Sequence, residues 1–200
     1  MASKERIARM KEETRINILK AALEIVKKEG WQALSMRKIA DAIEYTAPII
    51  YEYFANKDAI ILELTRTGFL KLAKKLQDAK DKHDSPAQQL EEMWLAYWNF
   101  AFDYTELYQV MFGVTTSCSC EMVNKLPEAE CPWSIVTPSI AKLMNIDDID
   151  SDVVCTKYYT FWSVIHGLVS INLVNRGNSD EINKQVLRDA ITGIIRSITP

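Results

Sequence analysis

Apolar residues recur at helical spacing in almost every segment of this chain, and no segment alternates in the way a half-buried β-strand would. In the first segment Ile7, Met10, Ile18 and Ile25 fall on one stripe, charges fill the other faces, and Gly30 provides a stop. We therefore predict an all-α fold of about nine helices. The predicted helices cover residues 7–28, 36–43, 47–53, 57–82, 87–104, 106–114, 132–144, 150–175 and 180–198.

Capping residues divide these helices into two groups. Ser35 and Thr46 are good N-cap residues for two short helices, and Asn56 can cap the long helix that follows. Residues 115–132 show little periodicity and are predicted to form a loop, while Pro138 is expected to bend or split the helix that contains it. The expected organisation is a three-helix domain over residues 1–56 and a larger helical bundle over residues 57–200.

Charge is distributed unevenly along the chain. The formal net charge is -3. Residues 1–40 nevertheless hold ten Lys and Arg against five Glu, so the remaining residues carry a net charge of -8. A basic end on an acidic body suggests a polyanionic partner such as nucleic acid, and the alternative is a solvated basic face.

Composition excludes several classes of protein. With 48% hydrophobic and 26% charged residues, the chain has an ordinary globular composition, and it lacks the long apolar run of a membrane span. No apolar segment follows the basic N-terminal residues as in a secretory signal, so we expect a cytoplasmic protein. Four cysteines are too few for a disulfide scaffold. Cys118, Cys120 and Cys131 lack the paired spacing of a usual zinc site, so ordinary loop thiols are favoured over metal or redox sensing.

Two short helices joined by a tight turn and preceded by a basic helix form a helix-turn-helix, whose second short helix can enter a major groove. The segment 35–57 has an Ile-Ala pair on its first helix, a hydroxyl residue at the start of the second, a Tyr-x-Tyr-Phe end, and a lysine three residues later. In these features the segment resembles the N-terminal domain of TetR-like transcriptional regulators. The resemblance extends over roughly residues 12–62.

The resemblance implies a role for each matched position. Ile39, Ala40, Ile43, Ile50 and Phe54 would form the small core that fixes the helix angle. Phosphate oxygens would be bound by Ser35, Thr46, Tyr51 and Lys57, with Arg37 and Lys38 adding positive charge. Base edges would be contacted by Ala47, Pro48 and Ile49, with one polar contact from Tyr45. Because the base-facing side chains are mostly apolar, thymine methyl groups and DNA shape would contribute much of the specificity.

Two points in this segment remain open. The three tyrosines could simply cover the small core; we favour that role for Tyr53 and DNA contact for Tyr45 and Tyr51. TetR-like turns usually have Ala-Gly where this chain has Ile43-Glu44. Glu44 therefore implies either modest strain or a different turn, and a carboxylate near phosphate is unfavourable for DNA binding.

The C-terminal half carries a second, shorter resemblance. Trp162, His166 and Gly167 are similar to the Trp-x-x-x-His-Gly signature of the WHG-type effector domain in TetR-like regulators. The small residues Gly167 and Ser170, with Val186, Ile191 and Ile194/Ile195 on the last helix, would form a four-helix homodimer interface. A dimer would bring two recognition helices to successive major grooves about 34 Å apart and would match a palindromic operator.

Aromatic residues gather between residues 94 and 112. An apolar cavity lined by such side chains, with a few polar tips, would suit a flat or lipophilic effector. The predicted effector-binding residues are Trp94, Tyr97, Trp98, Phe102, Tyr104, Tyr108, Phe112, Trp133 and His166. The alternative for each of them is a place in the core, and for His166 a hydrogen-bonded structural role.

The resulting expectation is a homodimeric regulator, most simply a repressor, that a small-molecule effector releases from double-stranded DNA. No catalytic residue, metal site or cofactor is predicted, because the chain has no phosphate loop, nucleophile elbow or His-Glu metal motif. The alternatives are a helical enzyme with unrecognised residues and a helical interaction module that has lost DNA binding.

Overall fold

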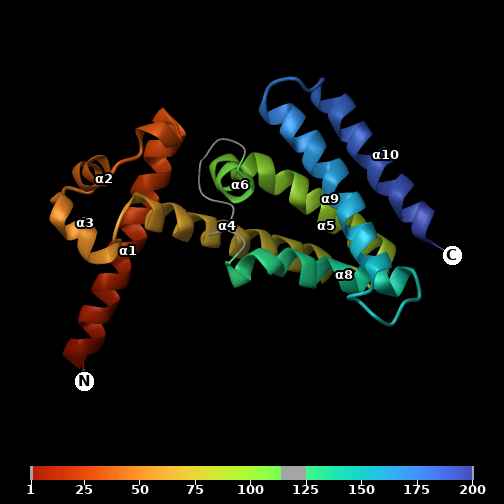
Figure 1. The fold of residues 1–200 in the computed structure, drawn as a ribbon, viewed down its shortest axis with the longest axis horizontal. Coiled ribbons are helices and arrows are strands. Elements are labelled where there is room, and N and C mark those ends of the chain that lie inside the picture. Colours follow the sequence, from red (N-terminus) through yellow and green to blue (C-terminus); the bar gives the residue numbers. More distant parts are fainter. Residues whose placement is uncertain (1, 114–124, 200) are drawn as a thin grey trace. The chain divides into compact units, whose positions relative to one another are not determined.

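A computed structural model of the chain describes residues 2–113 and 125–199, and the description is confined to them. The described residues contain nine α-helices, two 3-10 helices and no strand, which confirms the all-α prediction (Figure 1). They group into two compact units, one of residues 2–67 with 109–113 and one of residues 68–108 with 125–199. Each unit is described separately below.

The first unit contains the helix-turn-helix. It comprises α1 (Ala2–Glu29), the 3-10 turn η1 (Trp31–Ala33), α2 (Met36–Ala42), α3 (Ala47–Tyr53) and the first half of α4 (Lys57–Lys80) (Figure 1). The core of this unit is apolar. Its buried side chains include Ile18, Ala22, Trp31, Ile39, Ala40, Ile50, Phe54 and Ile60. The small core predicted for α2 and α3 is therefore present, although Ile43 is only partly buried.

Local capping fixes the start of α2 as the sequence predicts. The Ser35 side chain accepts a hydrogen bond from the Lys38 backbone N–H at 3.2 Å. Asn56 likewise accepts from the Ala59 N–H at 2.9 Å, before α4 begins. Thr46 occupies the N-cap position of α3, but its side chain makes no capping hydrogen bond. The start of α3 is therefore fixed by backbone contacts and by Pro48 in its first turn.

The turn between α2 and α3 is closed by a residue in the left-handed region. Glu44 has a φ of 58°. The Tyr45 N–H donates to the Ala40 carbonyl at 2.9 Å and the Glu44 N–H donates to the Asp41 carbonyl at 3.3 Å, which is the Schellman pattern of a helix end. Because this position usually requires glycine, the modest strain expected at Glu44 is present.

The N-terminal half of α1 differs from the sequence-based expectation. Ile7 and Met10 lie on the same apolar stripe as Ile18 and Ile25, yet both are more than half exposed. Every side chain from residue 4 to residue 13 is exposed. Only the second half of α1 therefore contributes to the core of its unit.

The second unit is a helical bundle. It comprises the remainder of α4, α5 (Pro86–Asp103), the start of α6 (Thr105–Phe112), η2 (Pro127–Glu130), α8 (Cys131–Leu143), α9 (Asp152–Leu173) and α10 (Asp180–Ile198). Helix α5 contacts α8, α9 and α10, and α9 also packs against α8 and α10. Its largest fully buried side chains are aromatic and include Trp94, Phe100, Tyr108 and Phe161. These contacts make α5 the central helix of the bundle.

Helix α8 begins at Cys131 and runs through Pro138 without interruption. The proline therefore does not split the helix, contrary to one of the two outcomes expected for it. The helix starts one residue before the predicted start at residue 132, so Cys131, predicted as loop, belongs to it. Pro132 lies in the first turn, where its missing N–H costs nothing.

A cluster of asparagines closes the turn between α9 and α10. The buried Asn183 donates to the Asn172 side-chain oxygen at 2.6 Å and to the Asn178 carbonyl at 2.9 Å. Asn172 in turn donates to the Leu168 carbonyl at 2.9 Å. Gly177 lies against this network, since a Cβ there would be 2.0 Å from the Asn172 oxygen. The network ties the start of α10 to the end of α9.

Candidate DNA-binding surface and effector site

The predicted recognition helix α3 presents an exposed face. Tyr45 and Tyr51 are 44% and 54% exposed. Thr46 and Pro48 are exposed as well, while Ala47 and Ile49 are partly buried. Ile50 and Phe54, on the opposite side of the helix, are buried in the core of the unit. The structure thus leaves the side of α3 that carries the predicted DNA contacts open to solvent.

Two of the three predicted phosphate-binding cations, Lys38 and Lys57, have partners within the chain. Lys38 forms an ion pair with Glu29 at 2.6 Å, with both side chains about half exposed. Lys57 is partly buried and its ammonium donates to the Trp31 carbonyl at 3.4 Å. Arg37 is exposed. Because exposed pairs contribute little energy, Lys38 can exchange its partner for a phosphate at small cost.

Ser35 and Glu44 have the least favourable chemistry for an anion. The Ser35 oxygen accepts the α2 capping bond, so it can meet a phosphate only by donating its hydroxyl proton. The Glu44 side chain is exposed at the turn that precedes α3. Its carboxylate would repel a nearby DNA phosphate, and this repulsion is screened by salt.

In the second unit, most of the predicted effector residues are packed against one another. Trp94, Tyr97, Trp98 and Tyr108 are buried. Tyr104, Trp133 and His166 are partly buried, and Phe102 is 41% exposed. Phe112 is partly buried and belongs to the first unit. Tyr104 lies beneath the ammonium groups of Lys71 and Lys75, at 4.3 and 5.3 Å from its ring centre.

The polar tips of this cluster form one hydrogen-bonded network. The Tyr108 hydroxyl bonds to His166 Nδ1, and the Tyr97 hydroxyl lies 3.1 Å from the Tyr108 hydroxyl and 3.3 Å from the same nitrogen. The Trp162 Nε1–H donates to the Tyr97 hydroxyl at 3.0 Å. His166 is therefore hydrogen-bonded within the second unit.

Burial controls the protonation of this network. It lowers the pKa of His166, because desolvation disfavours the imidazolium. Burial raises the pKa of Tyr97 and of Tyr108 for the same reason, so both phenols keep their protons. Nδ1 of His166 can accept from Tyr108 only while it carries no proton, so the lowered pKa of His166 favours the observed arrangement.

Several members of the cluster lie outside the predicted set. Trp162 stands beside His166, with ring centres 5.4 Å apart, and Phe161 stacks on Trp94 at 5.4 Å. Tyr158 packs against Trp133 at 4.8 Å. The spacing of four residues from Tyr158 to Trp162 and from Trp162 to His166 places these rings on one side of α9. That spacing is the signal in the sequence that could have identified them.

Comparisons with known proteins agree with the geometry of the first unit. Residues 18–64 match the family model described as bacterial regulatory proteins, tetR family. These residues comprise the buried half of α1, the helix-turn-helix and the start of α4. The matched segment is thus similar to the N-terminal domain of that family. No curated protein sequence matches the chain.

Solved structures share the fold over nearly the whole chain. A protein of unknown function from Rhodococcus sp. RHA1 has a TM-score of 0.76 at 18% identity, covering 93% of this chain and 95% of its own. The regulator FadR from Bacillus subtilis, in complex with stearoyl-CoA, has a TM-score of 0.71 at 18% identity, covering 89% and 98%. A TetR family regulator from Marinobacter aquaeolei VT8 has a TM-score of 0.66 at 17% identity, covering 96% and 97%. The matched segment is thus followed by a helical bundle whose fold these solved structures share.

The remaining candidate groups give no site of their own. Cys118 and Cys120 lie outside the described residues, and Cys131 is a partly exposed free thiol. Within residues 2–113 and 125–199, no three His, Cys, Asp or Glu residues are placed to hold a metal ion. No helix in the same residues is long and apolar enough to cross a membrane.

Proposed function

We propose that the protein is a transcriptional repressor that binds a palindromic operator as a homodimer and is released by a small-molecule effector. In this proposal residues 1–56 bind DNA, and residues 57–200 bind the effector and form the dimer. The single observation that carries the proposal is the exposed face of α3 within the segment that matches the tetR-family model. Ile50 and Phe54 anchor the other side of α3 in the core and would fix its angle to α2, so its exposed side could enter a major groove.

DNA binding would combine positioning and readout. Arg37, Lys38 and Lys57, with the hydroxyl groups of Thr46 and Tyr51, would bind phosphates and fix the register. Base edges would be contacted by Tyr45 and by three apolar residues of α3, which are Ala47, Pro48 and Ile49. Such a surface favours thymine methyl groups and a preferred DNA shape over hydrogen-bonded base readout.

Dimer formation would use α9 and α10. The exposed apolar side chains here are Val164 and Ile171 on α9, Val174 directly after α9, and Ile182 and Val186 on α10. A Cβ at Gly167 or Gly193 would meet nothing within 4 Å, so the chain itself leaves room for a neighbouring helix at both glycines. Ile191 is buried within the protomer and would support the interface from beneath without contacting the partner.

The effector would bind at the aromatic cluster of the second unit. Its rings suit a flat or lipophilic ligand, and its polar tips are neutral: two phenols, an indole and an imidazole of lowered pKa. The Bacillus subtilis FadR structure, with stearoyl-CoA, supports the idea that this fold accommodates a lipophilic effector. Release would require the effector to prefer one spacing of the two recognition helices, with a coupling of about 1–3 kcal/mol.

A mobility-shift and footprinting assay on DNA upstream of the protein's own gene tests the proposal. We expect a palindromic footprint whose affinity falls steeply with salt. Arg37→Ala and Lys57→Ala should weaken binding to all sequences alike, whereas Pro48→Ala should change which bases are preferred. Lys74→Ala, an exposed lysine of the second unit, is the matched control and should have no effect. A folded dimer that prefers no sequence over random DNA would refute the proposal.

The dimer surface has its own test. Ile171→Glu places a charge on the exposed apolar face of α9, where the side chain is 48% exposed. We expect it to shift the protein from dimer to monomer in analytical ultracentrifugation while the helical circular dichroism is unchanged. Leu70→Glu, at a site 43% exposed on α4, is the control. Equal behaviour of the two variants would show that α9 and α10 are not the interface.

A further inference from the structure

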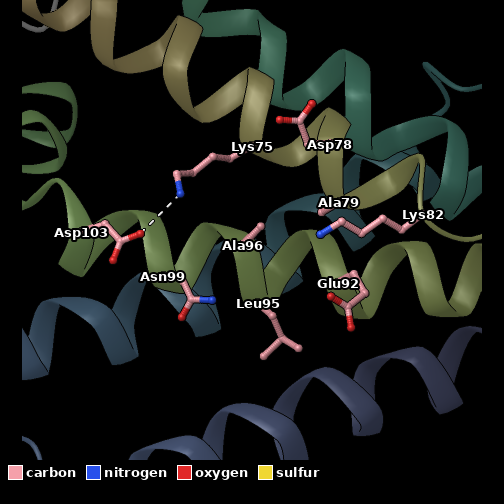
Figure 2. Close-up of a pocket in the computed structure, with 9 residues that line it drawn as sticks. All are labelled: Lys75, Asp78, Ala79, Lys82, Glu92, Leu95, Ala96, Asn99 and Asp103. Carbon is pink, nitrogen blue, oxygen red and sulfur yellow. Dashed lines mark hydrogen bonds and ion pairs between the residues drawn. The ribbon is translucent and has the colours of Figure 1, made fainter.

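A groove lies between α4 and α5 of the second unit (Figure 2). Its volume is about 490 Å³, within the range of small-molecule sites. None of the predicted effector-binding residues lines it. The hollow exists because both helices place alanine at its centre, Ala79 from α4 and Ala96 from α5 (Figure 2). Larger side chains at these positions would fill it.

The two ends of the groove differ in their pairing. At one end, Lys75 and Asp103 form an ion pair at 3.4 Å that bridges α4 and α5. At the other end, Lys82, in the turn that follows α4, and Glu92, on α5, both line the groove (Figure 2). In the part of the chain that the structure describes, neither side chain has a hydrogen bond or an ion pair. The groove therefore offers one ammonium and one carboxylate that are not neutralised by the chain.

Asn99 adds a third available polar group. It lies on α5, on the same side as Glu92, and its amide is exposed at the wall of the groove (Figure 2). The alanines between the two ends provide an apolar floor. Opposite charges beside a short apolar surface complement a ligand that carries both charges and an apolar side chain.

We propose that this groove binds a free amino acid with an apolar side chain. Its carboxylate would be bound by the Lys82 ammonium and its ammonium by the Glu92 carboxylate. Its side chain would lie over Ala79 and Ala96, and Asn99 would supply an additional hydrogen bond. The site is separate from the proposed effector cluster, and its occupation does not depend on DNA binding.

Calorimetric titration with L-leucine tests the assignment on the full chain. Two analogues remove one charge each: 4-methylpentanoate lacks the ammonium group and 3-methylbutylamine lacks the carboxylate. We expect leucine to bind about three- to tenfold more tightly than either analogue, because each lost contact is a charge-assisted hydrogen bond at a partly exposed site. Equal affinity of the three compounds, or no saturable binding of leucine, would overturn the proposal.

Four variants locate the binding. Lys82→Met and Glu92→Gln should each weaken leucine binding about three- to tenfold, whereas Lys142→Met, at an exposed lysine of α8 that does not line the groove, should leave it unchanged. The double variant Lys82→Glu with Glu92→Lys retains both charges, so it should recover much of the binding with the ligand reversed. A double variant that binds as poorly as both single variants together would contradict the charge pairing.

A filling variant tests the groove without changing its charge. Ala96→Met keeps helix propensity and places a flexible apolar side chain over the floor. We expect leucine binding to be lost while the circular dichroism and the DNA affinity remain those of the original protein. Because binding is measured directly, failure here is distinguishable from failure of the proposed regulator function. Undiminished leucine binding in Ala96→Met would place the ligand elsewhere.

Discussion

Glu44, in the α2–α3 turn, occupies a position where helix ends usually have glycine, and replacing it tests whether the turn is strained. Glu44 has a φ of 58°, in the left-handed region, and closes a Schellman motif through its own N–H and that of Tyr45. A side chain in this region costs about 1–2 kcal/mol. Glycine removes that cost but loses about 0.5–1 kcal/mol of unfolded-state entropy. We therefore expect Glu44→Gly to raise the free energy of unfolding by about 0.5–1 kcal/mol.

Urea denaturation followed by circular dichroism measures this change as a higher midpoint at unchanged slope. The matched control is Glu44→Ala, which removes the carboxylate but keeps a Cβ in the left-handed region. Fluorescence anisotropy with operator DNA should show tighter binding for both variants, because both remove a negative charge near phosphate. The stabilisation should appear in the glycine variant only. If Glu44→Gly unfolds at a lower urea concentration than Glu44→Ala, the strain assigned to this turn is wrong.

Three further predictions concern stability. Gly177→Ala should destabilise the protein by roughly 1–3 kcal/mol, because its Cβ would displace the Asn172 side-chain oxygen, which accepts a partly buried hydrogen bond from Asn183; thermal unfolding measures the loss. Burial lowers the pKa of His166 below its usual 6.5, so the unfolded chain binds a proton more readily and stability should fall as the pH drops below 6.5. Urea midpoints measured across that range should lose this slope in His166→Gln and keep it in His83→Gln. Ser35→Ala should cost about 1 kcal/mol through loss of the α2 cap, whereas Thr46→Ala, which removes no capping bond, should cost clearly less in the same assay.

Much of the fold could be predicted from the sequence because capping and periodicity agree. Helix α3 has the predicted bounds, Ala47–Tyr53, and α10 has the predicted bounds, Asp180–Ile198. The α2 cap at Ser35 could also be predicted, since the helix start requires an acceptor for an unpaired N–H. The family resemblance could be stated because its features lie within one short segment, where neighbours in sequence are neighbours in space.

Other features could not be predicted because they depend on what packs against a helix. Ile7 and Met10 share a stripe with Ile18, and periodicity alone does not show that nothing within the unit covers the first part of that stripe. The α4–α5 groove depends on small residues of two helices, Ala79 and Ala96, lining one hollow, which no local pattern reveals. In the sequence, Lys82 and Glu92 cannot be distinguished from the charged residues of an ordinary solvent-exposed helix face.

The predicted effector residues illustrate the same limit. The richness in aromatic residues between 94 and 112 indicated a cluster, but not which rings would bond to one another. His166 joins Tyr97 and Tyr108 across a long sequence separation. Which of these side chains contact a ligand stays a prediction.

The exposed first half of α1 has a kinetic consequence. Turns held only by their own backbone hydrogen bonds are marginal in water and open readily. Amide deuteration should therefore be fast over residues 4–13 and slow from Ile18 to Val26, where side chains enter the core. A polyanion or protein that binds along residues 4–13 would slow amide exchange there and leave exchange from Ile18 to Val26 unchanged. The buried part of α1 would then serve as an internal reference for binding to the exposed part.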